Sequence, residues 1–347
     1  MTGRNPVPAR GAFAAISVGY WVTISAICAC IGAIWLTTKP GNFADVDTYI
    51  LYLDQLIHFP PANWWYFEVL SNFYLITIHY VFPSVEYAIF IAHYLLGVIF
   101  VLLVIISLPP RTSSWHSVLF LFCILGPVLA FVTLRATPAY FLVSAGALYA
   151  MRRDPRAWIY IIIAFLFHAS TLLALPPLLL LYFQRWWPNS LKGRRALWIF
   201  AVAVALLLIG MVVLPQIISA MISLIQNTPY LSKYIAYTDE VLPVDHVTSI
   251  SHYVFMVFVV IFSGAFLISS SGDVDKIRIY IMSSILVYLF TFIALSPVAA
   301  FRQAPFFLIP MISLFPWKKF GINGPISFIF ILACAGMFVF QFDQVYI

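Results

Sequence analysis

The sequence predicts an all-α polytopic membrane protein of about 10–11 transmembrane helices, on three observations. First, the 347 residues are 63% hydrophobic and 9% charged, with a mean hydropathy of +1.01, whereas soluble proteins carry roughly 25% charged residues. Second, the apolar runs are long and continuous, without the period-two alternation of a membrane barrel. Third, the basic residues gather in short clusters between those runs, a pattern that orients membrane helices.

The candidate spans follow one another along the whole chain, some of them short or broken. They lie at about 12–36, 84–107, 115–134, 137–151, 157–184, 196–219, 252–270, 277–298, 303–316 and 322–342. The first run is longer than the core of a signal peptide and has no clear cleavage site, so we expect a retained span. The aromatic run 61–82 carries Glu68 and His79, and is expected to lie at the interface or to re-enter. We find no internal repeat and expect a single domain, 1–347.

The segment 157–184 carries His168 near its middle, and its topology follows from the basic residues around it. If the segment forms a hairpin of two short helices turning near His168, most basic residues face the cytoplasm. Of the 18 lysines and arginines, the outside then keeps only Lys39, Arg135, Lys233 and Arg302. A single crossing would move several basic clusters outside, against the positive-inside rule. We therefore expect a hairpin, a cytoplasmic N-terminus and long outer loops at about 37–83 and 220–251.

Several classes of function are disfavoured by the same composition. The net charge of +6 arises from membrane-flanking clusters and does not indicate nucleic-acid binding. The four cysteines lie inside apolar runs and are interpreted as packing residues. There is no phosphate-cradling P-loop and no dinucleotide fingerprint. No cytoplasmic loop is large enough for a nucleotide-sugar domain, so a transferase of this kind would take its donor from the membrane.

Three isolated polar residues form a candidate anion site on the outer side. Arg135 and Arg302 each lie between apolar runs, where a buried charge is costly and should face a polar cavity or lipid headgroups. His168 lies at the expected hairpin tip, although a lone histidine in a membrane protein can also be a packing residue. The planar fork of arginine suits phosphate, because it can bond two oxygens at once.

A second constellation follows the first span, where Asp45, Asp47 and Tyr49 lie close together in the sequence GNFADVDTYILYLD. Either aspartate could act as a general base toward an acceptor hydroxyl or as a metal ligand, and a solvated loop is the alternative. The outer aromatic residues Tyr49, Trp64 and Tyr237 could stack on sugar rings. Their alternative role is the ordinary belt of aromatic residues at the membrane interface.

The order of these landmarks resembles the EpsG family of Wzy-like membrane proteins, which polymerise exopolysaccharide or O-antigen. The resemblance spans about residues 40–310. It rests on Asp45 to Tyr49, Arg135 before a short apolar helix, Phe167-His168-Ala169-Ser170, the Leu175-Pro176 step and Arg302 in AFRQAPFFLIP. It implies a C-type glycosyltransferase fold. It also implies donor and acceptor glycans carried on undecaprenyl pyrophosphate, at the outer face of the bacterial inner membrane.

The resemblance also implies roles for the candidate residues. Arg135, His168 and Arg302 would hold the lipid pyrophosphate, and Asp45 or Asp47 would activate the acceptor hydroxyl. No cofactor is expected, and a divalent metal at Asp45 and Asp47 is not favoured, because pyrophosphate is already a good leaving group. Flippase and chain-length-regulator proteins are candidate partners, with membrane lipid. The alternatives are a single-sugar transferase or glycan ligase, and, in another class, a lipid-linked glycan transporter or flippase.

Overall fold

The computed structural model describes most of the chain in seven ranges and a few short stretches. These are 10–58, 68–110, 113–183, 250–269, 272–294, 297–320 and 325–343, with 198, 200–202, 322 and 345–346. Every regular element in these ranges is helical, apart from one isolated bridge between Phe43 and Tyr346, so the all-α class is confirmed. Most of the predicted span 196–219 and most of the loop 220–251 lie outside the described residues.

The chain separates into two compact units. The first comprises Met1–Leu142, Tyr160–Ala169 and Ile312–Ile347, and the second comprises Val143–Ile159 and Ser170–Met311. Several helices divide their residues between the units, among them α6 (Ala136–Met151) and α7 (Arg156–Phe167). The single domain expected from the sequence stays a prediction, because two units of this kind can belong to one membrane domain.

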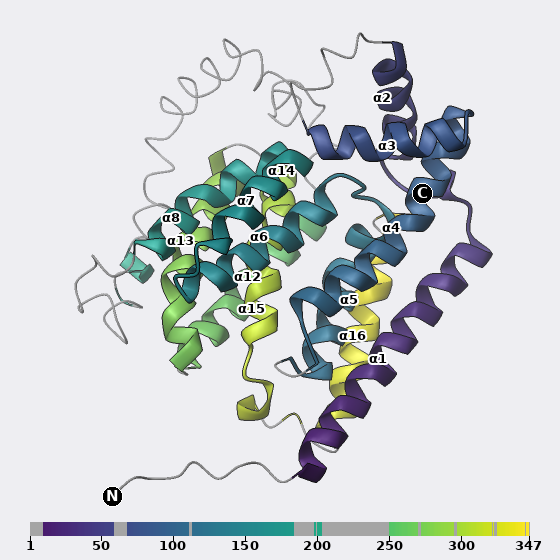
Figure 1. Cartoon of the computed structure of the whole chain (residues 1–347). Helices are drawn as coiled ribbons and strands as arrows, with labels where there is room; N and C mark the ends of the chain where they lie inside the picture. Colours follow the sequence, from purple (N-terminus) through teal and green to yellow (C-terminus); the bar gives the residue numbers. More distant parts are fainter. Residues whose placement is uncertain are drawn as a thin grey trace, which may run out of the picture. The chain divides into compact units, whose positions relative to one another are not determined.

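Long apolar helices form the body of the first unit (Figure 1): α1 (Arg10–Thr37), α4 (Val85–Ser107), α5 (Trp115–Phe131) and α16 (Pro325–Asp343). Helix α5 packs against the other three. Its side chains are buried around nearly the whole circumference, as expected for a central helix that is apolar on every side. The short helix η7 (Trp317–Phe320) joins this core where the Trp317 indole donates to Ser117 Oγ at 2.7 Å.

Two shorter helices occupy the predicted outer loop 37–83, which is therefore largely helical. The turn η1 (Pro40–Asn42) is followed by α2 (Val46–His58) and later by α3 (Val69–Val81). Helix α2 buries Val46, Tyr49, Leu53 and Leu56, a spacing of three and four residues that gives one apolar face. Asp47 is exposed on this short helix, and Asp45 lies immediately before it.

The second unit is organised around α13 (Gly272–Ala294), which packs against three neighbours. These are α8 (Leu175–Tyr182), α12 (Ile250–Ile268) and α14 (Pro297–Gln303). Helix α15 (Pro305–Leu314) follows α14 after a bend of 41°, as expected for a broken span. The buried Tyr280 hydroxyl donates to the carbonyl of Phe306 at 2.8 Å and joins α13 to α15.

The predicted hairpin at 157–184 is confirmed by one aromatic contact. Helix α7 ends at Phe167, the 3₁₀ helix η3 (Ala169–Ala174) follows, and α8 completes the segment. The rings of Trp158 and Tyr182 lie with their centroids 5.3 Å apart. An unbroken α-helix would separate these residues by roughly 36 Å at about 1.5 Å per residue. The chain therefore doubles back, and His168 lies at the break between the two arms.

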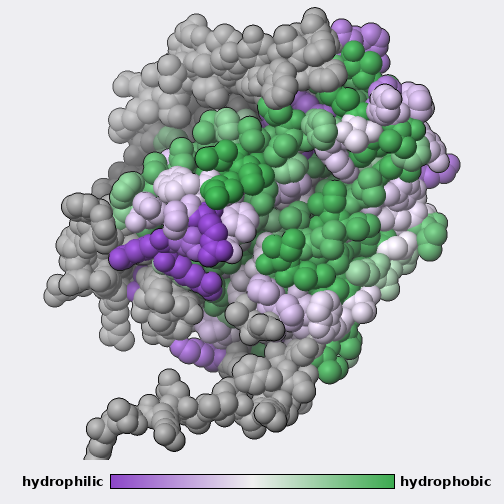
Figure 2. Space-filling model, viewed as in Figure 1, coloured by the Kyte–Doolittle hydropathy of each residue, from purple (hydrophilic) through white to green (hydrophobic). Residues whose placement is uncertain are grey.

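The described helices are those of a membrane protein. Four of them are long and apolar enough to cross a membrane, or five if the bent α14–α15 pair forms one span, and six further apolar helices have 10–17 residues. Apolar side chains cover much of the visible surface of the described helices (Figure 2). On α16, for example, Phe328 and Val339 are exposed, as suits contact with lipid. A polytopic helical membrane protein is confirmed, while the number of 10–11 spans stays a prediction.

Candidate functional site

The centre of the candidate site is Glu68, a buried carboxylate in the first unit. Glu68 precedes α3, and its backbone has left-handed dihedral angles of φ 49 and ψ 45, a conformation that is costly for a residue with a side chain. Only 1% of its side chain is exposed. An ionised carboxylate removed from water is stable only where cations and hydrogen-bond donors surround it. Three donors from distant parts of the chain meet this requirement.

The first donor is Arg135, in the tight turn between α5 and α6. Its Nη1 lies 2.7 Å from Glu68 Oε2, and its side chain is 23% exposed. The guanidinium carbon lies 4.4 Å from the ring centre of Tyr52 and 5.5 Å from that of Tyr49. Burial disfavours the charged form, but Glu68 and the two tyrosines outweigh it, so the pKa of Arg135 is raised above its ordinary value. Arg135 is therefore a fixed cation.

The second and third donors come from the tip of the hairpin. His168 Nδ1 lies 2.7 Å from Glu68 Oε1, and the histidine side chain is 17% exposed. The backbone N–H of Ala169 donates to the same oxygen at 3.3 Å. The helix ends at Phe167 and the backbone changes to a 3₁₀ turn at Ala169, so this N–H is directed away from the α-helical ladder. The break in the segment therefore presents both donors to one carboxylate oxygen.

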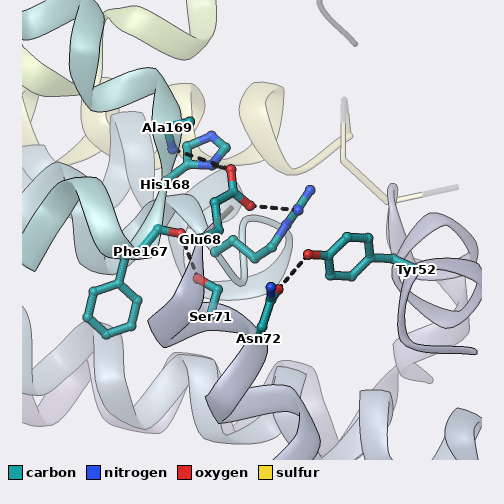
Figure 3. A network of polar contacts seen from close by, with 8 residues as sticks. Tyr52, Glu68, Ser71, Asn72, Phe167, His168 and Ala169 are labelled. Carbon is teal, nitrogen blue, oxygen red and sulfur yellow. Dashed lines mark hydrogen bonds and ion pairs between the residues drawn. The ribbon is translucent and has the colours of Figure 1, made fainter. Parts of the chain in front are cut away.

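Two further hydrogen bonds fix the elements that carry these groups (Figure 3). The Ser71 hydroxyl donates to the carbonyl of Phe167 at 2.7 Å, which joins the first turn of α3 to the end of α7. The Tyr52 hydroxyl donates to Asn72 Oδ1, which joins α2 to α3. Burial of Tyr52 raises the pKa of its hydroxyl, so it remains a neutral donor beside the arginine. We call Glu68, Arg135, His168, Tyr52 and Asn72 the Glu68 cluster.

The cluster has donor capacity beyond its internal bonds. Arg135 Nε is buried and has no hydrogen-bond partner among the described residues. A guanidinium has five N–H donors, and a carboxylate or phosphate oxygen is their usual acceptor. An unsatisfied buried donor is costly, and an anionic ligand would relieve that cost. The arrangement can therefore bind an anion beside a histidine whose ring orientation is fixed.

The predicted site residues are found in different places. Arg135 and His168, far apart in sequence, meet at Glu68, and Tyr49 faces Arg135. Asp45 and Asp47 lie at the start of α2 with exposed side chains. Their predicted roles, and that of Tyr49 toward sugars, stay predictions. The other members of the predicted set are Arg302, in the last turn of α14 in the second unit, and Trp64 and Tyr237, which lie outside the described residues.

Glu68, Tyr52 and Asn72 were absent from the sequence-based site. Glu68 was assigned to an outer loop, although it is the only acidic residue of the aromatic run 61–82. An ionisable residue in an apolar run of a membrane protein often indicates a functional position. This signal could have identified Glu68 from the sequence. Within the described ranges, no group of three or more His, Cys, Asp or Glu side chains could hold a metal ion; metal independence stays a prediction.

Comparison with known proteins extends the resemblance seen in the landmark residues. A model of the EpsG family matches residues 20–346 of the 347-residue chain. No curated protein and no solved structure matches the chain. The match includes every residue of the Glu68 cluster as well as Arg302.

Proposed function

We propose a function from the premise that this chain belongs to the EpsG family, as its match over residues 20–346 establishes. The protein is a membrane glycosyltransferase that polymerises undecaprenyl-pyrophosphate-linked repeat units into exopolysaccharide or O-antigen. It acts at the outer face of the bacterial inner membrane, with its N-terminus in the cytoplasm. Both the donor and the acceptor glycan are anchored in the same bilayer.

The observation that carries this proposal is the pairing of Arg135 and His168 through Glu68. Each contact to the carboxylate is 2.7 Å long, and the carboxylate itself is buried. Ionisable side chains buried within helical membrane proteins are rare and often mark the path of a substrate or ion. A cation with an unsatisfied Nε suits a phosphate-bearing lipid, whose head would enter the protein from the bilayer.

In the proposed reaction, the chain stabilises charge on the leaving group. The acceptor hydroxyl attacks the anomeric carbon of the donor sugar, and the bond from that carbon to the pyrophosphate oxygen breaks. The lipid pyrophosphate leaves with the electron pair, and Arg135 and Arg302 balance its charge. A general base removes the proton of the hydroxyl, and the candidates are Asp45, Asp47 and His168. Tyr49, Trp64 and Tyr237 would bind sugar rings beside the reacting groups.

The test is polymer length in a host strain that lacks the chromosomal gene and carries plasmid-borne variants. We expect Arg135→Ala, His168→Ala and Arg302→Ala each to abolish the ladder of repeat lengths on a gel while unpolymerised repeat units accumulate. The matched control is Arg152→Ala, which removes an exposed arginine from the turn after α6 and should leave the ladder intact. Immunoblots of membrane fractions check that every variant is present.

Purified protein then separates polymerisation from transport and single transfer. Full-length chain in detergent is incubated with undecaprenyl-pyrophosphate-linked repeat units extracted from the host strain. A ladder of lengths is expected, since detergent micelles offer no compartment for transport. Addition of one unit only, or no covalent product, would contradict the proposed function.

A further inference from the structure

Glu68 is the point at which the candidate site is assembled. Its Oε2 accepts from Arg135, while its Oε1 accepts from both His168 and the backbone of Ala169. The three donors come from the α5–α6 turn and the tip of the α7–α8 hairpin, while Glu68 itself lies immediately before α3. A single carboxylate thus sets the distance and orientation between the side chains of Arg135 and His168.

Packing alone does not account for a glutamate at this position. The residue has a left-handed backbone and forms no side-chain cap for α3, so it stabilises neither the turn nor the helix end in the usual way. A buried ion pair is often no more stable than apolar residues of similar volume. Local strain together with a buried charge is typical of functional positions, where the surrounding structure holds an unfavourable arrangement in place.

The contact with Glu68 also determines the chemistry of the histidine. An ionised carboxylate only accepts hydrogen bonds, so the nitrogen that faces it, Nδ1, must carry a proton. In the neutral ring of His168 the lone pair then lies on Nε2. Carboxylate–histidine pairs of this kind fix the tautomer of catalytic and metal-binding histidines. They also stabilise the imidazolium that forms when the histidine takes a proton.

We infer that Glu68 is the positioning residue of the transferase site. It holds His168 in the tautomer whose Nε2 carries the lone pair, for a role as base toward the acceptor hydroxyl, and it orients Arg135 for the pyrophosphate. This inference rests on the proposed function and selects one base among the candidates left open there. It favours His168 over Asp45 and Asp47, because a buried carboxylate holds the ring of His168, whereas both aspartates are exposed.

The proposed step is balanced in protons and electrons. Nε2 of His168 takes the proton of the acceptor hydroxyl as that oxygen forms its bond to the anomeric carbon. The bond from the anomeric carbon to pyrophosphate breaks, and its electron pair leaves with the lipid pyrophosphate beside Arg135. The imidazolium is stabilised by the negative charge of Glu68 until it releases its proton to water. No oxidant, reductant or further reactant is required.

The first test measures the tautomer directly and needs no substrate. Full-length protein labelled with ¹⁵N-histidine is studied by NMR in detergent at the pH of the activity assay. The chain has seven histidines, so the His168 signal is identified by its loss in His168→Gln. We expect a proton on Nδ1 and none on Nε2 in the wild type, and a shift toward the Nε2-protonated form in Glu68→Ala. A wild-type ring protonated on Nε2 would overturn the inference.

The second test asks whether Glu68 acts through His168. Glu68→Gln keeps the shape of the side chain but removes its charge. We expect kcat for elongation to fall about 100-fold or more, and KM for the donor to rise as well, because Arg135 loses the carboxylate that orients it. In a His168→Gln background the same substitution should lower kcat by a much smaller factor, because residues that act as a unit are not additive. The matched control is Glu86→Gln, at an exposed position in the first turn of α4.

The outcomes separate the two proposals. Equal losses from Glu68→Gln in the wild-type and His168→Gln backgrounds would indicate a structural role and overturn the inference, as would wild-type kcat in Glu68→Gln. A wild-type protein that elongates nothing, while its His168 tautomer responds to Glu68→Ala as expected, would overturn the proposed function and leave the orientation of His168 by Glu68 intact.

Discussion

At the scale of the residue, the contacts of Arg135 depend on the planar shape of its guanidinium as well as on its charge. Its guanidinium contacts a carboxylate at 2.7 Å and lies 4.4 Å from the ring centre of Tyr52. A planar, delocalised cation can make both contacts and still present Nε to a ligand, whereas the ammonium of lysine is a compact point charge on a flexible stem. The two basic side chains should therefore differ at this position.

We predict that Arg135→Lys retains a folded protein but weakens the binding of the lipid-linked donor. The variant keeps the positive charge beside Glu68 and loses the forked donors and the stacking on Tyr52. A charged hydrogen bond contributes about 1.5–3 kcal/mol, so KM for the donor should rise roughly 10- to 100-fold. Steady-state elongation by purified protein measures this, with Arg152→Lys at an exposed position as control. An unchanged KM would show that the fork of Arg135 does not bind donor.

Removal of the arginine should also expose how much of the local stability depends on Glu68. Arg135→Ala leaves the buried carboxylate of Glu68 without the guanidinium that neutralises it. Removing one partner of a buried ion pair typically lowers the free energy of unfolding by about 3 kcal/mol or more. We predict a lower thermal unfolding temperature for Arg135→Ala in detergent. The double variant Arg135→Ala/Glu68→Gln should recover part of the loss, since the remaining side chain is then neutral. Equal unfolding temperatures for the single and double variants would contradict this explanation.

At the scale of the element, the hairpin could be predicted but the centre of the site could not. The distribution of basic residues required the segment 157–184 to return to the same side, and the Trp158–Tyr182 contact agrees. The charge pattern carries no information about which side chains meet at the tip. Glu68 reaches His168 across 100 positions of sequence, and its two partners are on separate segments. A lone acid in an aromatic run marks Glu68 as unusual but does not identify its partners.

Helix packing in the first unit depends on one close approach between α1 and α4. A Cβ atom added at Gly97 would lie 2.8 Å from Ile31 Cγ2 and 3.3 Å from the Trp35 indole nitrogen. Small residues allow membrane helices to approach in this way, and the β-branched side chain of Ile31 has little freedom to move aside.

We therefore predict that Gly97→Ala destabilises the protein by about 1–3 kcal/mol, the usual effect of overpacking. Thermal unfolding of purified protein measures the change. The control is Gly336→Ala on α16, where an added Cβ meets nothing within 4 Å. That control should be neutral or slightly stabilising, because alanine favours the helix. If both variants unfold at the same temperature, the close approach of α1 and α4 does not limit stability.

At the scale of the whole molecule, the proposed reaction requires the Glu68 cluster to open on the outer side of the membrane. The assignment rests on the positive-inside rule, because the helices themselves do not distinguish one side of a bilayer from the other. Helix α2 carries the exposed Gln55, and the turn after α6 carries the exposed Arg152. These two positions should lie on opposite sides of the membrane, and substitution of either should disturb no buried contact.

We predict that a membrane-impermeant maleimide labels Gln55→Cys in intact spheroplasts and labels Arg152→Cys only after permeabilisation. Both variants are made in a background in which the four native cysteines are replaced. Ser190→Cys, beyond α8 and outside the described residues, should behave like Arg152→Cys, because the hairpin returns the chain to the side on which it began. Labelling of Arg152→Cys in intact spheroplasts would place α2 and the Glu68 cluster on the cytoplasmic side. The repeat units would then have to react before crossing the membrane, and the outer-face reaction would be wrong even if the cluster still binds pyrophosphate.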